Sequence, residues 1–284
     1  MTKSLTRRTS IALGILMTSC LLAPAAMAQT VYKTGVDAAF APHAMKTLAG
    51  ELEGFQIDLG KALGEEMGAS IEIEGVENSA LVPALLSKKY DFLIAPVVVT
   101  PERTEQMLFT EGYINTQFAF TTKADSSGLD KQEDLKGKKI AVNKGSIYEQ
   151  WAAANAEKYG FSYDVYNSNA DAVQAVSSGR ADANMAILTV AAFAAKQNPA
   201  VKVAFGIDSG LVTALAFRPD DTAGRALFSN AIKCLKLNGT IAELSQKWFD
   251  YTPAADASAV VPDIGTGIEG MNGYDPAPVT AACK

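Results

Sequence analysis

The residues best suited to bind an anion follow a short apolar run near the middle of the sequence. Residues 92–94 are apolar and predict a buried strand. Thr100 then provides an N-cap, Pro101 suits the first helical position, and Arg103 follows on the first turn. A guanidinium there can bind a carboxylate through two parallel hydrogen bonds. We expect Arg103 to bind a ligand carboxylate; the simpler alternative is a surface arginine on a capped helix.

A second pattern of strand, loop and helix lies further along the chain. Residues 139–142 predict a strand, and Gly145 and Ser146 precede a predicted helix over 147–159. The backbone N–H groups of such a helix start can receive an anion. A Gly-Ser pair also occurs where only a turn is needed. We expect Ser146 to share the ligand carboxylate with Arg103.

An acid and an aromatic ring follow the first predicted strand, residues 31–36. Asp37 and Phe40 lie in the turn after this strand. Loops at strand ends face the crevice of an open α/β sheet, so Asp37 is placed to meet a cationic or hydroxyl group of a ligand. A core position is the alternative for Phe40.

Strands and helices alternate along most of the chain, which predicts an α/β fold. The helix over 55–67 has Phe55, Leu59, Leu63 and Met67 on one face. Further strands are expected at 71–74, 117–122, 163–166, 183–186 and 212–217, and further helices from near Ser79, around 170–176, and over 223–237 and 240–249.

Several segments, taken in order, resemble the periplasmic solute-binding proteins that serve ABC importers of polar amino acids and opines, extracellular solute-binding family 3. These are residues 54–59, 81–85, 89–91, 109–113, 137–142 and 178–183, with Thr100 to Arg103 among them, and the resemblance covers 31–249. It implies a type II periplasmic binding protein fold, with two α/β lobes, a two-strand hinge and a ligand cleft. Lobe 1 would comprise 31–115 plus 213–250, and lobe 2 would comprise 116–212.

The resemblance also implies a function. The protein would capture a small carboxylate-bearing amino acid or derivative in the periplasm and deliver it to the membrane subunits of a permease. It would be a monomer without cofactor, metal or enzymatic activity. Phe40 would stack on the ligand, and the remaining positions that match ligand contacts are Asn78, Val98, Ile147 and Ile187, with Met185 and Tyr148 shaping the wall in lobe 2.

Some of these positions depart from the family pattern. Ile187 replaces an aspartate that pairs with the ammonium of a free amino acid, and burying an unpaired ammonium is costly. Val98 replaces a common Ser or Thr, and Ile147 replaces a second hydroxyl residue after Gly145. Asn78 is polar where an apolar or aromatic contact is common. The ligand therefore either lacks a free α-amine, as in an opine, or pairs that amine elsewhere.

The ends of the chain have their own character. Residues 1–28 predict a cleavable signal peptide, with a basic start, an apolar segment too short to span a bilayer and small residues before Gln29. A twin-arginine signal or lipid attachment at Cys20 fits less well. Residues 251–284 are rich in Pro and Gly and predict an extended or loosely ordered tail. Cys234 and Cys283 remain after cleavage, and an oxidising compartment favours their pairing, although Cys234 also suits a buried thiol.

Charge and composition argue against several other functions. Removal of three basic residues with the signal peptide leaves 22 basic against 31 acidic residues, a net charge of −9, which argues against nucleic-acid binding. The single histidine, His43, argues against a histidine-based metal site or catalytic triad. An enzyme on the same fold, such as a cyclohexadienyl dehydratase, is the alternative, but the expected cleft offers few acids or bases. A receptor sensor domain is disfavoured because no apolar span follows Asp250.

Overall fold

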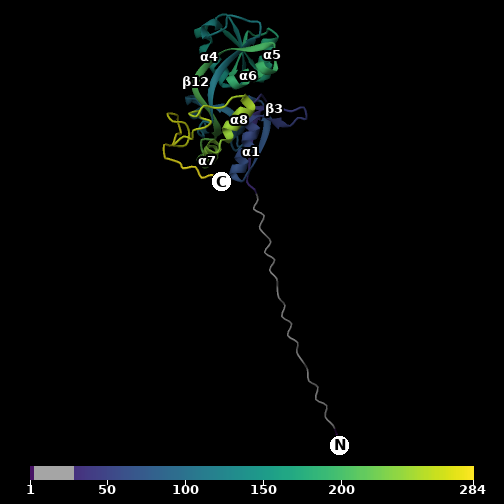
Figure 1. The fold of residues 1–284 in the computed structure, drawn as a ribbon, viewed down its shortest axis with the longest axis vertical. Helices are drawn as coiled ribbons and strands as arrows, with labels where there is room; N and C mark the ends of the chain where they lie inside the picture. Colours follow the sequence, from purple (N-terminus) through teal and green to yellow (C-terminus); the bar gives the residue numbers. More distant parts are fainter. Residues whose placement is uncertain (3–28) are drawn as a thin grey trace.

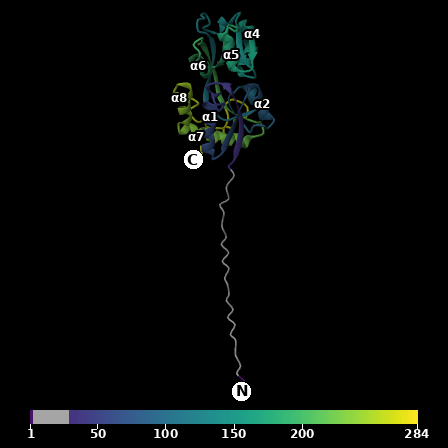
Figure 2. The ribbon, with the colours of Figure 1, turned by 90° about the vertical axis from the view of Figure 1, so that its right-hand side faces the viewer.

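The computed structural model describes residues 1–2 and 29–284, so the predicted signal peptide lies almost wholly outside the described residues. The chain forms two lobes joined by long strands (Figure 1), and the view from the side separates the same two bodies (Figure 2). One lobe carries α4 (Ile147–Tyr159), α5 (Asn169–Ser177) and α6 (Leu188–Gln197). The other carries α1 (Phe55–Met67), α2 (Asn78–Leu86), α7 (Thr222–Leu237) and α8 (Thr240–Phe249).

Two antiparallel strands connect the lobes. β8 (Ile114–Lys123) and β12 (Val201–Phe217) pair from Lys123 opposite Val201 to Ile114 opposite Thr213. On one side of this pair lie β11 (Ala183–Ile187), β9 (Lys139–Asn143) and β10 (Ser162–Tyr166), and on the other lie β6 (Leu93–Val98) and β7 (Leu108–Phe109). The predicted two-lobed fold with a two-strand hinge is confirmed. Both hinge strands are longer than the sequence indicated, and we keep the expected lobe limits as a proposal.

The lobe that we call lobe 1 contains further short strands. β1 (Val31–Asp37) pairs in parallel with β5 (Ser70–Val76). The Thr34 hydroxyl connects β1 to the start of β6, since it donates to the Phe92 carbonyl at 2.8 Å and accepts from the Ile94 N–H at 2.9 Å. The segments β2 (Ala39–Phe40), β3 (Ala44–Lys46) and β4 (Leu52–Glu53) form a small antiparallel sheet. A short helix, α3 (Pro101–Thr104), and a 3₁₀ turn, η1 (Gln132–Leu135), complete the described elements.

Each lobe has its own apolar core. In lobe 1 the predicted face of α1 is buried through Phe55, Leu59 and Leu63, whereas Met67 is partly exposed at the end of the helix. In lobe 2 the core gathers around Phe120, with its ring stacked on Phe205 at 4.6 Å between centroids. Burial of these side chains supplies the main driving force for folding each lobe. None of the helices in the described part of the chain is both long and apolar enough to cross a bilayer.

The C-terminal tail, residues 251–284, contains neither helix nor strand, yet it is fastened to lobe 1. Lys236 on α7 donates to the Val261 carbonyl at 3.1 Å, and Arg225 on the same helix donates to the Gly273 carbonyl at 2.5 Å. The expectation of a loosely ordered tail was therefore incomplete. Composition predicts the lack of regular structure, but the donors that hold the tail belong to a distant helix.

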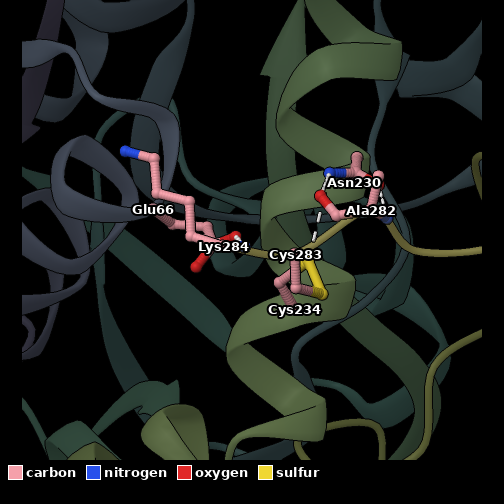
Figure 3. The surroundings of a disulfide bond; sticks show 6 residues. All are labelled: Glu66, Asn230, Cys234, Ala282, Cys283 and Lys284. Carbon is pink, nitrogen blue, oxygen red and sulfur yellow. Dashed lines mark hydrogen bonds between the residues drawn. A yellow bond between two sulfur atoms is a disulfide. The ribbon is translucent and has the colours of Figure 1, made fainter.

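A disulfide closes the end of this tail. Cys234 and Cys283 are bonded, with their Cα atoms 5.4 Å apart, as the sequence predicted (Figure 3). Beside it, Asn230 donates to the Ala282 carbonyl and accepts from the Ala282 N–H, both at 2.9 Å. Lys284 donates its backbone N–H to Glu66 on α1 at 3.0 Å. The last residues are thus attached to both α1 and α7.

Candidate ligand-binding site

A cavity of about 50 Å³ lies between the two lobes. Lobe 1 contributes the predicted site residues Asp37, Phe40, Asn78, Val98 and Arg103, and lobe 2 contributes Ser146 and Ile147. The structure therefore brings together every predicted ligand-binding residue except Ile187. Asn143, Gly145 and Tyr148 also line the cavity, and Asn143 is a residue for which no role was predicted.

Arg103 is held at the end of strand β6. Thr100 caps the helix by accepting a hydrogen bond from the Arg103 N–H at 3.3 Å, as predicted, and Nη1 of Arg103 donates to the Val98 carbonyl at 2.9 Å. Burial lowers the pKa of Arg103, and the neighbouring Tyr148 partly opposes this change. Because α3 has only four residues, its N-terminus is too short to form an anion site. The guanidinium, with five N–H donors in total, is the group that can bind a carboxylate here.

The start of α4 is already occupied by groups of the chain itself. Ser146 is the N-cap, since its Oγ accepts from the Glu149 N–H at 3.2 Å and donates to the Asn143 carbonyl at 2.5 Å. The Gly145 N–H donates to the Glu149 carboxylate at 2.6 Å. The carboxylate of Glu149 therefore occupies the position at the start of α4 where the sequence suggested that a ligand carboxylate would bind. Ser146 lines the cavity as predicted, but its hydroxyl is engaged in the cap.

Asp37 and Asn143 meet across the cleft. Oδ1 of Asp37 accepts from the Ala39 N–H at 3.0 Å, and Oδ2 accepts from Nδ2 of Asn143, also at 3.0 Å. Asp37 is 5 % exposed and Asn143 is 1 % exposed. Burial raises the pKa of Asp37, and the two hydrogen bonds act in the opposite direction. One buried hydrogen bond thus joins the end of β1 in lobe 1 to the end of β9 in lobe 2.

Other polar contacts also join the lobes. Asn78 donates to the Lys144 carbonyl at 2.9 Å, and Nε2 of His43 lies 2.8 Å from the Thr189 hydroxyl. Burial lowers the pKa of His43 to about 3, so this imidazole is neutral at neutral pH. The structure is therefore a closed arrangement in which both lobes surround the cavity.

Two aromatic side chains, Phe40 and Tyr148, line the cavity and also pack in the core of lobe 2. Phe40 comes from lobe 1 but packs with the lobe 2 core and stacks on His43 with ring centroids 5.7 Å apart. Tyr148 is buried and packs edge-on against Phe118, with the ring centroids 5.7 Å apart. Burial raises the pKa of Tyr148. Phe40 is consequently both a core ring and a cavity-lining ring.

Ile187 does not line the cavity that contains Arg103. It ends strand β11, packs in the lobe 2 core, and lines a second inter-lobe cavity of about 360 Å³. That cavity is also lined by residues of the hinge strands and the tail, among them Ile114, Thr116, Thr213, Pro253 and Ala257. Ile187 therefore lines the second cavity and not the one that contains Arg103, and its contact with a ligand stays a prediction.

This fold and site define a two-lobed solute-binding protein. The chain belongs to the bacterial extracellular solute-binding proteins, family 3, whose family model matches residues 32–251. An L-arginine-binding protein of Pseudomonas aeruginosa is 33 % identical over 252 residues, covering 84 % of this chain and 95 % of its own.

Solved structures agree with this assignment. An ancestral arginine-binding protein bound to arginine has a TM-score of 0.74 and 32 % identity, over 78 % of this chain and 99 % of that one. An ancestral amino acid-binding protein described as a precursor of cyclohexadienyl dehydratase has a TM-score of 0.72 and 32 % identity, over 77 % of this chain and 95 % of that one. These similar proteins are named for binding amino acids and not for catalysis.

Proposed function

We propose that this chain is the substrate-binding component of an ABC importer for a carboxylate-bearing amino acid or amino-acid derivative. The observation that carries the proposal is Arg103, a partly buried guanidinium that lines a cavity enclosed by both lobes. Family membership and the similarity to arginine-binding proteins support it. The protein would reach the periplasm through a signal peptide over 1–28 and act as a monomer.

Ligand capture follows from the closed arrangement. A ligand in the cavity contacts Arg103 from lobe 1 and Tyr148 from lobe 2 at once, so it has a higher affinity for the closed state than for an open one. Such a difference in affinity shifts the population towards closure. The closed form would then dock on the membrane subunits of the permease and release its ligand.

The residues that line the cavity favour an amino-acid derivative in which the α-nitrogen is substituted. Asp37 is the one carboxylate that lines the cavity within the described residues, so it can balance only one cationic group of a ligand. Val98 and Ile147 make the nearby walls apolar. A free α-ammonium without its own acid would cost several kcal/mol on burial. The nitrogen of an opine is a secondary amine that is also protonated, but the opine brings a second carboxylate beside it, which offsets this charge.

The similar proteins indicate a basic side chain at the other end of the ligand. Asp37 could balance a guanidinium or ammonium on that side chain. An arginine-derived opine such as octopine combines the carboxylates, the substituted nitrogen and the guanidinium. The full ligand is larger than the present cavity, so we expect its complex to hold the lobes further apart than they are here.

A binding screen tests this proposal. Thermal shift measurements would compare the twenty amino acids with opines and other carboxylates, followed by calorimetry on each hit. A ligand at millimolar excess over a tight Kd raises the melting temperature because it stabilises by RT ln(1 + [L]/Kd). We expect octopine to give a larger shift than arginine. Submicromolar binding of arginine without binding of any opine would contradict the proposal that the α-nitrogen of the ligand is substituted. It would leave the proposed importer role intact.

The enzymatic alternative has less support. A dehydratase needs an acid or base placed against its substrate. Asp37 is the only cavity-lining acid in the described part of the chain, and it serves as an acceptor for Ala39 and Asn143. We therefore propose binding without catalysis.

A further inference from the structure

Three side chains with metal-binding chemistry meet where the tail ends (Figure 3). Glu66 of α1, Cys234 of α7 and Cys283 of the tail place a carboxylate oxygen and two sulfurs within 4.8 Å of one another. In the oxidised protein the two sulfurs form a disulfide, so they are not thiolates that could bind a metal ion. None of these three residues lines the cavity that contains Arg103. Reduction of the disulfide would therefore create a cluster of two thiols and one carboxylate on lobe 1, apart from the ligand cavity.

The end of the tail is held in place by contacts other than the disulfide. Asn230 exchanges two hydrogen bonds with the backbone of Ala282, both at 2.9 Å. The backbone N–H of Lys284 donates to Oε1 of Glu66 at 3.0 Å, and Nζ of Lys284 donates to the Glu65 carbonyl at 2.7 Å. The residues on both sides of the tail cysteine are thus fastened to α7 and α1. We expect these contacts to keep the two thiols close together after reduction.

We propose that the reduced protein binds one Zn²⁺ ion through the thiolates of Cys234 and Cys283 and the carboxylate of Glu66. Zn²⁺ takes thiolate and carboxylate ligands in tetrahedral geometry, with Zn–S distances of about 2.3 Å. Two sulfurs on one such ion lie about 3.8 Å apart, so a small movement of each sulfur suffices once the covalent bond is broken. The Cα atoms of the two cysteines are 5.4 Å apart and can stay in place. A water molecule would complete the four ligands.

The chemistry of these ligands selects the kind of metal ion. Thiolates are soft ligands that favour Zn²⁺, whereas Mg²⁺ and Ca²⁺ prefer oxygen ligands alone. Nδ2 of Asn230 lies 3.9 Å from Sγ of Cys234. This amide is therefore a donor that can stabilise the thiolate from outside the metal site.

The site forms in two balanced steps. A dithiol reductant transfers two electrons and two protons to the disulfide, which gives two thiols, and the reductant is itself oxidised to a disulfide. Cys283 is exposed, so a reductant can reach the bond from the tail. Zn²⁺ then replaces the two thiol protons, which are released to solvent. Zinc would thus fasten the tail to α1 and α7 in place of the disulfide.

The test titrates the chain over residues 29–284 with Zn²⁺ in its oxidised and its reduced form. The disulfide is reduced with a water-soluble phosphine, which takes its oxygen from water, and the excess is removed without air. Calorimetry should give one Zn²⁺ per reduced chain, bound on the order of a hundredfold more tightly than by the oxidised chain. Titration of the reduced chain with Co²⁺ should produce the near-ultraviolet thiolate-to-cobalt absorption band. Zn²⁺ should raise the melting temperature of the reduced protein and leave that of the oxidised protein unchanged.

Variants separate the metal ligands from their surroundings. Cys283→Ser should lose both the absorption band and tight Zn²⁺ binding. Glu66→Gln should keep the thiolate band but weaken Zn²⁺ binding about tenfold or more. Glu65→Gln is the matched control, because Glu65 is an exposed neighbour on the same helix and its carboxylate is outside the cluster. It should bind Zn²⁺ as the reduced wild type does.

Two results of the titrations would overturn the inference. One is an affinity of the reduced wild type for Zn²⁺ within threefold of that of reduced Cys283→Ser. The other is equal affinity of Glu66→Gln and Glu65→Gln, because the carboxylate would then not be a ligand. Circular dichroism follows the folding of each form. A reduced protein that unfolds and regains its structure with Zn²⁺ supports the site, whereas one that stays unfolded with Zn²⁺ overturns it.

Discussion

Glu111 and Lys236 form a fully buried ion pair, with Oε1 and Nζ 2.6 Å apart. Lys233, one turn earlier on α7, contacts the other oxygen of the same carboxylate. Tail carbonyls of Val261 and Asp263 accept from these two lysines. Burial lowers the pKa of Lys236, and Glu111 opposes this change. The tail therefore supplies one acceptor to each of two buried ammonium groups.

Replacement of Glu111 should strongly destabilise lobe 1. Glu111→Gln leaves two buried lysines without a counter-charge, and breaking a buried pair on one side costs about 3–5 kcal/mol. For a chain of this size that cost corresponds to a fall in Tm of roughly 10 °C. Calorimetric melting measures it. Glu74→Gln, which breaks the exposed pair with Lys89, is the control and should melt as wild type does. Equal melting of the two variants would show that Glu111 is not critical.

The disulfide should stabilise the folded chain by holding the tail on α7. Cys234 and Cys283 are separated by 49 positions, and the chain-entropy model gives about 3–4 kcal/mol for a loop of this length. The Cys234→Ala/Cys283→Ala double variant should lose this amount in urea unfolding. Intact mass after alkylation, with and without reductant, verifies the bond in periplasmic protein. Two freely alkylated thiols in unreduced wild type would contradict it.

Local rules predicted the helix starts well. The predicted Thr100 cap with Pro101 is observed, and α4 spans the predicted residues 147–159, because a helix start depends mainly on neighbouring residues. The rule did less well at α2, where Ser79 was expected near the cap but Glu77 precedes the helix without a side-chain bond. The ordered segments that resemble solute-binding proteins supplied the two lobes and the hinge, which local periodicity alone does not specify.

Contacts between residues that are distant in the sequence could not be predicted from it. Asn143 lies 106 positions from Asp37, and nothing at either position shows that the two would meet. The placement of Ile187 in the second cavity depends on the packing of β11 against its neighbours. A signal was available for Glu149, since a glutamate three residues after a Ser N-cap is a known capping pattern. It would have indicated that the chain supplies its own anion at the start of α4.

Acid should weaken the fold through His43. The folded pKa is about 3 because of burial, below the ordinary value of 6.5. As the pH falls below 6.5 the unfolded chain takes up a proton that the folded chain excludes, so the free energy of unfolding decreases down to about pH 3. The loss from this group is roughly 4 kcal/mol over that window. Urea unfolding of wild type and His43→Gln at pH 7 and pH 4 measures it, and the advantage of wild type should shrink at pH 4. A constant difference between the two proteins would contradict the prediction.

Loss of the Arg103 guanidinium should abolish tight binding. Arg103 is the charged donor of lobe 1 at the cavity, and a bidentate bond to a buried carboxylate is among the stronger polar interactions. Arg103→Ala should reduce affinity for the best ligand of the screen a hundredfold or more. Arg103→Lys keeps the charge but not the planar pair of donors, so it should recover only part of the loss. Arg180→Ala is the matched control, since Arg180 is an exposed arginine of lobe 2 away from the cavity. Calorimetry gives each Kd, and an Arg103→Ala affinity within threefold of wild type would show that the carboxylate binds elsewhere.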